Sequence, residues 1–297
     1  MPPTLIDGKA IAEQINAETV VEIARLKNRC RVTPGLAVIL VGENPASVTY
    51  VSMKDKMCAR LGIHSERVNL PASIRESDLL DGINNLNLKQ EIHGILVQSP
   101  LPSQISEETV FAAISPAKDV DGFHPLNVGK LAIGDPTGFV PCTPAGVHEL
   151  LIRSGVKIDG AHVVVLGRSR IVGRPVSLIL SQKAVHANAT VTVCHSRSRN
   201  LAEICRSADI LVAAIGTPRF VKADMVRDGA VVIDVGTNRI EEKTSDKGYR
   251  LVGDVDFDAV SQKASLITPV PGGVGPMTIA MLMHNTVRAA RMQYGVS

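Results

Sequence analysis

Short apolar segments alternate with longer amphipathic segments along most of the chain. The apolar run GLAVILVG predicts a buried strand over residues 35–42. A helix is predicted over 45–61, with Asn44 as its cap, Pro45 at its first position and Gly62 just past its end. The alternation continues with strands over 65–71 and 93–100 and helices over about 76–88 and 105–115. Such an order is typical of parallel strands joined by crossover helices.

The stretch from 115 to 146 interrupts this alternation. It is rich in proline and glycine, which disfavour helices and central strands, so we expect a linker, a site, or both. A second series follows, with helices over about 144–154, 173–184, 201–208 and 276–293 and strands over 161–167, 189–195, 209–216, 229–236 and 249–255. The sequence therefore predicts an α/β protein of two α/β domains with a cleft between them. The expected domains are residues 1–143 with 277–297, and residues 144–276, the latter Rossmann-like with a mostly parallel sheet.

Composition narrows the function classes. The chain has 297 residues and is 45% apolar, but its apolar runs are far shorter than the roughly 20 residues that span a bilayer. The N-terminus has no basic segment followed by an apolar one, so we expect a cytoplasmic protein without a membrane partner. A net charge of +3 with 3% aromatic residues disfavours nucleic acid but suits a small anionic ligand. Five cysteines without a C-x-x-C pair and eight histidines without an H-x-x-x-H pair indicate neither disulfides nor a metal site.

The second domain contains a candidate phosphate-binding turn, VVVLGRSRIVGRP. Gly167 ends a predicted buried strand, and Gly173 lies near the start of the next helix. Backbone amides and a helix N-terminus at such a strand end favour a dinucleotide phosphate. The spacing differs from G-x-G-x-x-G, so a tight turn with solvated Arg168 and Arg170 is the alternative.

The next predicted strand favours NADP over NAD. It ends in HSRSR, residues 195–199, without the acidic residue that usually accepts from the ribose 2′-hydroxyl of NAD. Arg168, Ser196 and Arg197 are suited to bind a 2′-phosphate, although a solvated polar turn is the alternative. The run VIDVGTNR offers a further strand-end loop at Gly236 and Thr237 for the nicotinamide half, and its aspartate is interpreted as a structural turn residue.

In the first domain, the side chains of Lys54, Gln98 and Asp121 are expected at one end of the sheet. Tyr50 and Lys54 are four residues apart and share one face of the predicted helix. A solvated lysine is the common case, and a partly desolvated one is the alternative. Gln98 ends the strand HGILVQSP, and Asp121 lies in the loop KDVDGFHP, where an Asp-Gly turn is the alternative explanation.

Nine motifs in order along the chain carry a family resemblance: Y-V-x-x-K, V-Q-x-P-L-P, KDVDGFHP-x-N-x-G-x-L, PCTPAG, VVVLGRSRIVGRP, ATVTVCHSRS, VIDVGTNR, GDVDF and TPVPGGVGPMT. Together they resemble the bifunctional methylenetetrahydrofolate dehydrogenase/methenyltetrahydrofolate cyclohydrolase family. Ser99 and Thr237 depart from the usual pattern of that family.

The resemblance implies NADP-dependent oxidation of 5,10-methylenetetrahydrofolate and hydrolysis of the methenyl product to 10-formyltetrahydrofolate, in one-carbon metabolism and purine biosynthesis. By matching positions, Lys54 would be the catalytic lysine, Gln98 would hold it, Tyr50 would orient the folate and Asp121 would bind the pterin. Residues 1–143 with 277–297 would bind folate, and 144–276 would bind NADP. Pro271, Gly272 and Gly273 would approach the substrate. The expected NADP residues are Gly167, Arg168, Ser169, Gly173, His195, Ser196, Arg197, Gly236 and Thr237.

The resemblance also implies a homodimer, with folate as the small-molecule partner. Two alternatives stay open: a dehydrogenase with little cyclohydrolase activity, and a non-catalytic nucleotide-binding regulatory protein. Retention of the motifs does not separate the two activities, so each needs its own assay.

Overall fold

The computed structural model describes residues 3–242 and 248–296, which fold as two compact units. Residues 13–142 and 279–296 form the three-stranded unit, and residues 3–12, 143–242 and 248–278 form the six-stranded unit, each named after its parallel sheet. Helix α1 (Gly8–Cys30) and helix α10 (Val274–Gln293) each begin in the six-stranded unit and continue into the three-stranded unit.

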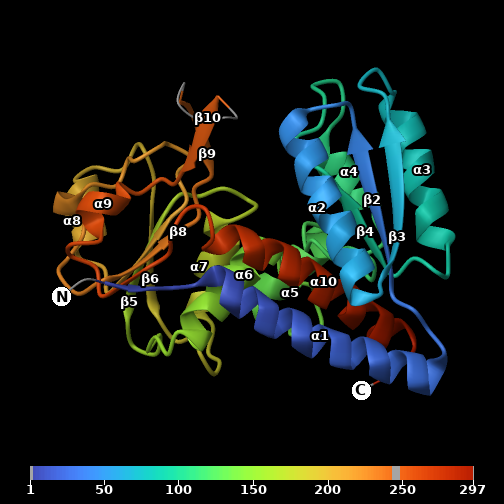
Figure 1. Cartoon of the computed structure of the whole chain (residues 1–297), viewed down its shortest axis with the longest axis horizontal. Helices are drawn as coiled ribbons and strands as arrows, with labels where there is room; N and C mark the ends of the chain where they lie inside the picture. Colours follow the sequence, from blue (N-terminus) through green and yellow to red (C-terminus); the bar gives the residue numbers. More distant parts are fainter. Residues whose placement is uncertain (1–2, 243–247, 297) are drawn as a thin grey trace. The chain divides into compact units, whose positions relative to one another are not determined.

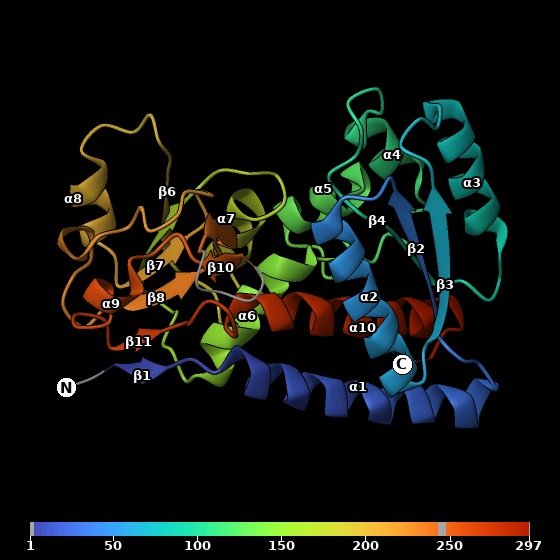
Figure 2. The ribbon, with the colours of Figure 1, turned by 45° about the horizontal axis from the view of Figure 1, so that its top comes forward.

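The three-stranded unit is built on a short parallel sheet in the order β3-β2-β4, in which β2 and β4 are buried and the edge strand β3 is partly exposed. Its strands are β2 (Gly35–Val41), β3 (His64–Leu70) and β4 (Gly94–Val97), and its helices are α2 (Pro45–Leu61), α3 (Glu76–Leu88), α4 (Glu107–Ala113) and α5 (Pro125–Ile133). The sheet lies between α2 and α3 (Figures 1 and 2). All positions of β2 are buried, as a central strand covered on both faces requires. Leu79, Ile83 and Leu86 of α3 pack in the same apolar cluster as Ile39 and Val97, each stabilising the fold by about 1.5–3 kcal/mol.

Helix α2 begins and ends where its capping residues predict. The side chain of Asn44 accepts hydrogen bonds from the backbone N–H groups of Ala46 and Ser47 at 3.0 and 3.3 Å. Gly62 stops the helix in the left-handed conformation, with φ of +77°. These local signals fix the bounds of the helix and so determine which of its residues face the sheet.

The six-stranded unit is a wholly parallel sheet in the order β1-β11-β8-β7-β5-β6. Its strands are β1 (Thr4–Leu5), β5 (His162–Leu166), β6 (Thr190–Cys194), β7 (Ile210–Ala213), β8 (Val231–Asp234) and β11 (Leu266–Ile267). Its remaining elements are α6 (Cys142–Arg153), α7 (Gly173–Ser181), α8 (Leu201–Arg206), α9 (Phe257–Val260), a 3₁₀ helix (Ala223–Met225) and the antiparallel hairpin of β9 (Asn238–Glu241) and β10 (Tyr249–Val252). The chain adds β6 on one side of β5 and then returns to place β7 on the other. Ligands bind at the carboxyl ends of the strands at such a reversal.

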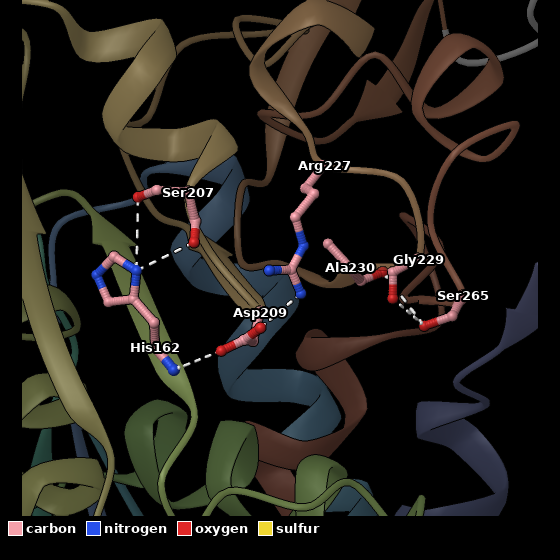
Figure 3. A network of polar contacts seen from close by, with 7 residues as sticks. All are labelled: His162, Ser207, Asp209, Arg227, Gly229, Ala230 and Ser265. Atoms are coloured by element: carbon pink, nitrogen blue, oxygen red, sulfur yellow. Dashed lines mark hydrogen bonds and ion pairs between the residues drawn. The ribbon is translucent and has the colours of Figure 1, made fainter.

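A polar network connects the amino ends of β5 and β7, at the opposite ends of the strands from the carboxyl ends (Figure 3). The carboxylate of Asp209 accepts from the backbone N–H of His162 at 2.7 Å and pairs with Arg227. The ring of His162 bonds to the backbone carbonyl of Ser207. His162 begins β5 and Asp209 directly precedes β7, so the network lies at the amino ends of the strands and supports stability rather than ligand binding.

The structure corrects three expectations. The stretch from 115 to 146 was expected to hold no helix before 144, but it contains α5, which Pro125 begins and Gly134 ends. No element was predicted before residue 35, yet α1 occupies 23 residues there. Residues 3–12 lie in the six-stranded unit instead of the other domain, because β1 pairs with β11.

Candidate functional site

Lys54 is buried in the three-stranded unit. Its side chain lies on the face of α2 that also buries Val51 and Cys58, and it is only 7% exposed. Its Nζ donates to Oε1 of Gln98 at 2.8 Å. The solvated alternative for this lysine is therefore wrong.

Gln98 holds the lysine from the carboxyl end of β4. Its backbone N–H continues the sheet ladder by donating to the carbonyl of Ile39 at 2.9 Å. Its Nε2 donates to the carbonyl of Ser99 at 2.8 Å, which turns Oε1 toward Lys54. A neutral amide thus orients the lysine without adding a charge that would hold its proton.

Asp121 and Lys54 influence each other electrostatically. Burial lowers the pKa of Lys54 below its ordinary value, and the negative charge of Asp121 opposes that shift. Burial raises the pKa of Asp121, and the positive charge of Lys54 opposes that shift in turn. Both shifts favour the neutral form of the group concerned.

The loop of Asp121 is fixed by a second, fully buried aspartate, Asp119. Its carboxylate accepts from the backbone N–H groups of Phe123 and His124 at 3.1 and 2.8 Å and from the side chain of Asn127 at 2.8 Å. Gly122 has a φ of +75°, which favours glycine in the turn that follows Asp121. The Asp-Gly turn is therefore present, and it presents Asp121 to the lysine.

The sequence analysis missed two residues at this site, Cys142 and Asn285. The thiol of Cys142 donates to the backbone carbonyl of Val120 at 3.4 Å, and burial raises the pKa of this thiol well above its usual range, with the charge of Asp121 adding to the shift. The side chain of Asn285, from α10, donates to the carbonyls of Val120 and Val140 at 2.8 and 3.2 Å. Cys142 lies within the motif PCTPAG, so a signal was available for it, whereas Asn285 carried none.

Tyr50 lies one turn before Lys54 on α2. Its side chain is 38% exposed, so its ring is accessible beside the buried lysine. The predicted group of Tyr50, Lys54, Gln98 and Asp121 thus lies within one unit, with its members on α2, after β4 and in the loop before α5.

In the six-stranded unit, the turn after β5 approaches its neighbours closely. A Cβ on Gly167 would lie 2.1 Å from the carbonyl oxygen of Ala214, and one on Gly173 would lie 2.1 Å from the carbonyl oxygen of Gly167. The hydroxyl of Ser169 accepts from the N–H groups of Val172 and Gly173 at 3.1 and 3.3 Å. Arg168 is exposed just after the strand, so the turn presents a cation and backbone at the carboxyl edge.

The loop after β6 is a compact polar turn. The N–H of Arg197 donates to Nδ1 of His195 at 3.2 Å, and the N–H of His195 donates to the hydroxyl of Ser198 at 3.0 Å. The side chains of Ser196 and Arg197 are exposed. No acidic residue lies between Cys194 and Asn200, so both exposed groups are available to an anion.

Two further predicted segments lie in the same unit. Gly236 is buried and Thr237 exposed in the loop after β8, and Asp234 accepts from the N–H of Gly236 at 3.0 Å. Asp234 is thus a structural turn residue, as interpreted from the sequence, and burial raises its pKa to about 7. Residues 271–273 directly precede α10, with a φ of +111° at Gly272.

Comparison with known proteins identifies the family to which this architecture belongs. A family model described as the catalytic domain of tetrahydrofolate dehydrogenase/cyclohydrolase matches residues 6–121, and the model of its NAD(P)-binding domain matches residues 141–294. The chain belongs to the tetrahydrofolate dehydrogenase/cyclohydrolase family. Its relatives include a bifunctional protein FolD of Dehalococcoides mccartyi (strain CBDB1), 57% identical over 296 residues, which cover 100% of this chain and 99% of that protein.

Solved structures of this family match along the whole chain. The bifunctional enzyme FolD of Campylobacter jejuni has a TM-score of 0.91 at 47% identity, covering 98% of this chain and 99% of that one. The FolD of Trypanosoma brucei, solved with NADP and an inhibitor, has a TM-score of 0.93 at 42% identity, covering 99% of both chains. These likenesses confirm the predicted family, the α/β fold class with its Rossmann-like C-terminal domain, the bifunctional enzyme class and NADP as cofactor.

Within residues 3–242 and 248–296, no helix is long and apolar enough to cross a membrane. The same part of the chain contains no group of three or more His, Cys, Asp or Glu side chains that could hold a metal ion.

Proposed function

We propose that the chain oxidises 5,10-methylenetetrahydrofolate with NADP and hydrolyses the methenyl product to 10-formyltetrahydrofolate. The observation that supports this best is the buried Lys54, hydrogen-bonded to the neutral Gln98 and next to Asp121. A lysine in such surroundings readily gives up its proton, which a hydrolase needs and a structural lysine does not.

Lys54 would act in the hydrolytic step. Water adds to the methenyl carbon, and the neutral amine of Lys54 takes one of its protons, leaving a neutral hydroxyl adduct. The bond from this carbon to N5 of the pterin then breaks, the hydroxyl becomes the formyl oxygen, and N5 gains a proton. The overall reaction releases one proton, and Lys54 serves as base in the addition and as proton carrier in the collapse.

Asp121 would bind the pterin. The pterin presents a ring N–H beside an amino group, two parallel donors that a carboxylate accepts in bidentate fashion. The fixed loop around Asp119 and Gly122 holds Asp121 for this contact. Tyr50, accessible one turn away from Lys54, would pack against the folate and keep the reacting carbon near the lysine.

The groups at the carboxyl edge of the six-stranded sheet fit NADP. Gly167, Ser169 and Gly173 would carry the phosphates at the turn and the start of α7, while Arg168, Ser196 and Arg197 would bind the 2′-phosphate. The support is the absence of an acid after β6 and the exposure of these three side chains. NADP, when bound, accepts the hydride from the methylene carbon. His195, Gly236 and Thr237 would complete the cofactor contacts, and backbone at Pro271, Gly272 and Gly273 would approach the substrate.

The remaining proposals follow from family membership. We propose that the enzyme is a homodimer, acts in the cytoplasm and supplies formyl groups for purine biosynthesis. Light scattering on the purified protein tests the dimer.

One absorbance experiment tests the two reactions together. The protein is mixed with methylenetetrahydrofolate and either NADP or NAD, and the reduced-cofactor and methenyl bands are followed. Reduced cofactor with only transient methenyl absorbance supports both activities, whereas lasting methenyl accumulation identifies a dehydrogenase with little cyclohydrolase activity. No change in either band leaves the non-catalytic nucleotide-binding protein.

A further inference from the structure

Asp254 occupies a central position in the six-stranded unit that neither the proposed catalytic residues nor the proposed cofactor residues include. It is 0% exposed, and its carboxylate is directed at the loops after two neighbouring strands. One oxygen, Oδ2, accepts from the backbone N–H groups of Ile215 and Gly216 at 2.7 and 2.8 Å. The other, Oδ1, accepts from the side-chain amide of Asn238 at 2.9 Å.

These three partners lie at the edge where a cofactor would bind. Ile215 and Gly216 follow β7, and Asn238 follows β8, so both loops leave the carboxyl ends of parallel strands. The carbonyl of Ala214, one residue before Ile215, is the group that Gly167 approaches at the predicted phosphate turn. Asp254 therefore fixes the backbone beside the reversal point of the sheet.

Asp254 is itself held by a buried carboxylate. Asp234, at the end of β8, accepts from the backbone N–H groups of Asp254 and Val255 at 2.9 and 3.0 Å and from that of Gly236 at 3.0 Å. A side chain on Gly236 would meet Oδ1 of Asp254 at 2.3 Å, so only glycine fits against the carboxylate. The loop after β8 is thus packed directly onto Asp254.

We propose that Asp254, paired with Asn238, is a positioning residue of the NADP site, which sets the loops after β7 and β8 for the nicotinamide half of the cofactor. The carboxylates of Asp254 and Asp234 together accept six hydrogen bonds, all of them from these two loops and from the segment that carries Asp254. The proposal rests on the proposed function for the identity of the cofactor. Asp254 would position the loops that hold the cofactor and would not contact the cofactor itself.

Donor and acceptor can be exchanged between the two residues. Asn238→Asp would place two carboxylates against each other, and the repulsion would displace the loop after β8. Adding Asp254→Asn would restore the pair with the roles reversed: Oδ1 of the new asparagine accepts from Ile215 and Gly216, and its amide donates to the new aspartate. Asp254→Ala would instead leave the backbone N–H groups of both Ile215 and Gly216 without their acceptor. Buried donors without an acceptor destabilise the folded state.

The experiment measures NADPH dissociation constants by fluorescence titration and Michaelis constants for NADP and for methylenetetrahydrofolate. Asp256→Ala is the matched control, because Asp256 lies two residues further on in an exposed ion pair with Lys222. We expect the NADPH dissociation constant to rise at least tenfold in Asp254→Ala and several-fold in Asn238→Asp. It should return to within about threefold of wild type in the double variant, and the Michaelis constant for folate should change less than threefold throughout.

The outcomes separate this proposal from a merely structural role. If both single variants bind NADPH as wild type does, or if the double variant regains thermal stability but not NADPH affinity, the positioning role is wrong. If Asp254→Ala fails to fold, the comparison of Asn238→Asp with the double variant still decides. Wild-type protein that neither binds NADPH nor reduces NADP would instead contradict the proposed function, before any variant is compared.

Discussion

A Gln98→Glu substitution tests how the site tunes its lysine. It would replace the neutral partner of Lys54, 2.8 Å away, with a carboxylate of nearly the same shape. An opposite charge at this range raises the pKa of a lysine by about 1–3 units. That shift would oppose the lowering caused by burial, so the fraction of neutral amine near neutral pH would fall, by up to about tenfold to a thousandfold.

The assay is the pH profile of cyclohydrolase kcat, followed by the loss of methenyl absorbance. In the wild type, the rate should rise with pH through the pKa of Lys54, because the neutral amine is the base. In Gln98→Glu the same rise should occur at higher pH, with slow hydrolysis near neutrality that recovers in alkaline buffer. Gln98→Met is the control, since it removes the hydrogen bond without adding a charge. A Gln98→Glu profile that loses rate equally at every pH would refute the reasoning.

Three further outcomes are expected. Tyr50→Ala should slow both activities, with a higher Michaelis constant for folate, because it removes a positioning contact; an effect on one activity alone would contradict this. The wild type should prefer NADP to NAD at least tenfold in kcat/KM, and Ser196→Asp should reduce this preference by repelling the 2′-phosphate; equal use of both cofactors by the wild type would contradict the assignment. The N–H of His162 and the charge of Arg227 hold the pKa of Asp209 below its usual range, so its contribution to stability is present above the unfolded pKa and is lost as pH falls through the folded pKa. Asp209→Asn should therefore lower the melting temperature by about 2–4 °C at pH 7 and by less near pH 3, and an equal loss at both would argue against this role.

Local signals explain what the sequence predicted correctly. Asn44, Pro45 and Gly62 mark the ends of α2 within the helix itself, so its bounds needed no tertiary information. The parallel sheets followed from uninterrupted apolar strands such as β2. In α5, by contrast, Pro125 and Gly134 were taken as loop residues, although proline at the first helical position and glycine just past the end are also the usual limits of a helix.

Burial at the site depends on partners far apart in the sequence. The pattern of its own helix favours a solvated Lys54, because the partner that holds it in the buried position, Gln98, lies 44 residues away in the sequence. Asn285 reaches Val120 across 165 residues. The hydrogen bond from Gly216 to Asp254 spans 38 residues. A sequence pattern within one helix or one loop contains none of this information. The motifs therefore predicted which segments form the site, whereas the supporting residues could be identified only from the three-dimensional structure.

The most direct test of the account is the ratio of the two activities in Lys54→Gln. The substitution keeps a hydrogen-bonding head but removes the titratable amine, while Lys56→Gln, an exposed position on the same helix, is the matched control. We predict that cyclohydrolase kcat falls by about 10²–10⁴-fold in Lys54→Gln, that the dehydrogenase falls much less, and that Lys56→Gln changes neither. An equal loss of both activities with unchanged folate binding and unchanged melting temperature would contradict a proton-transfer role for Lys54, as would full retention of both.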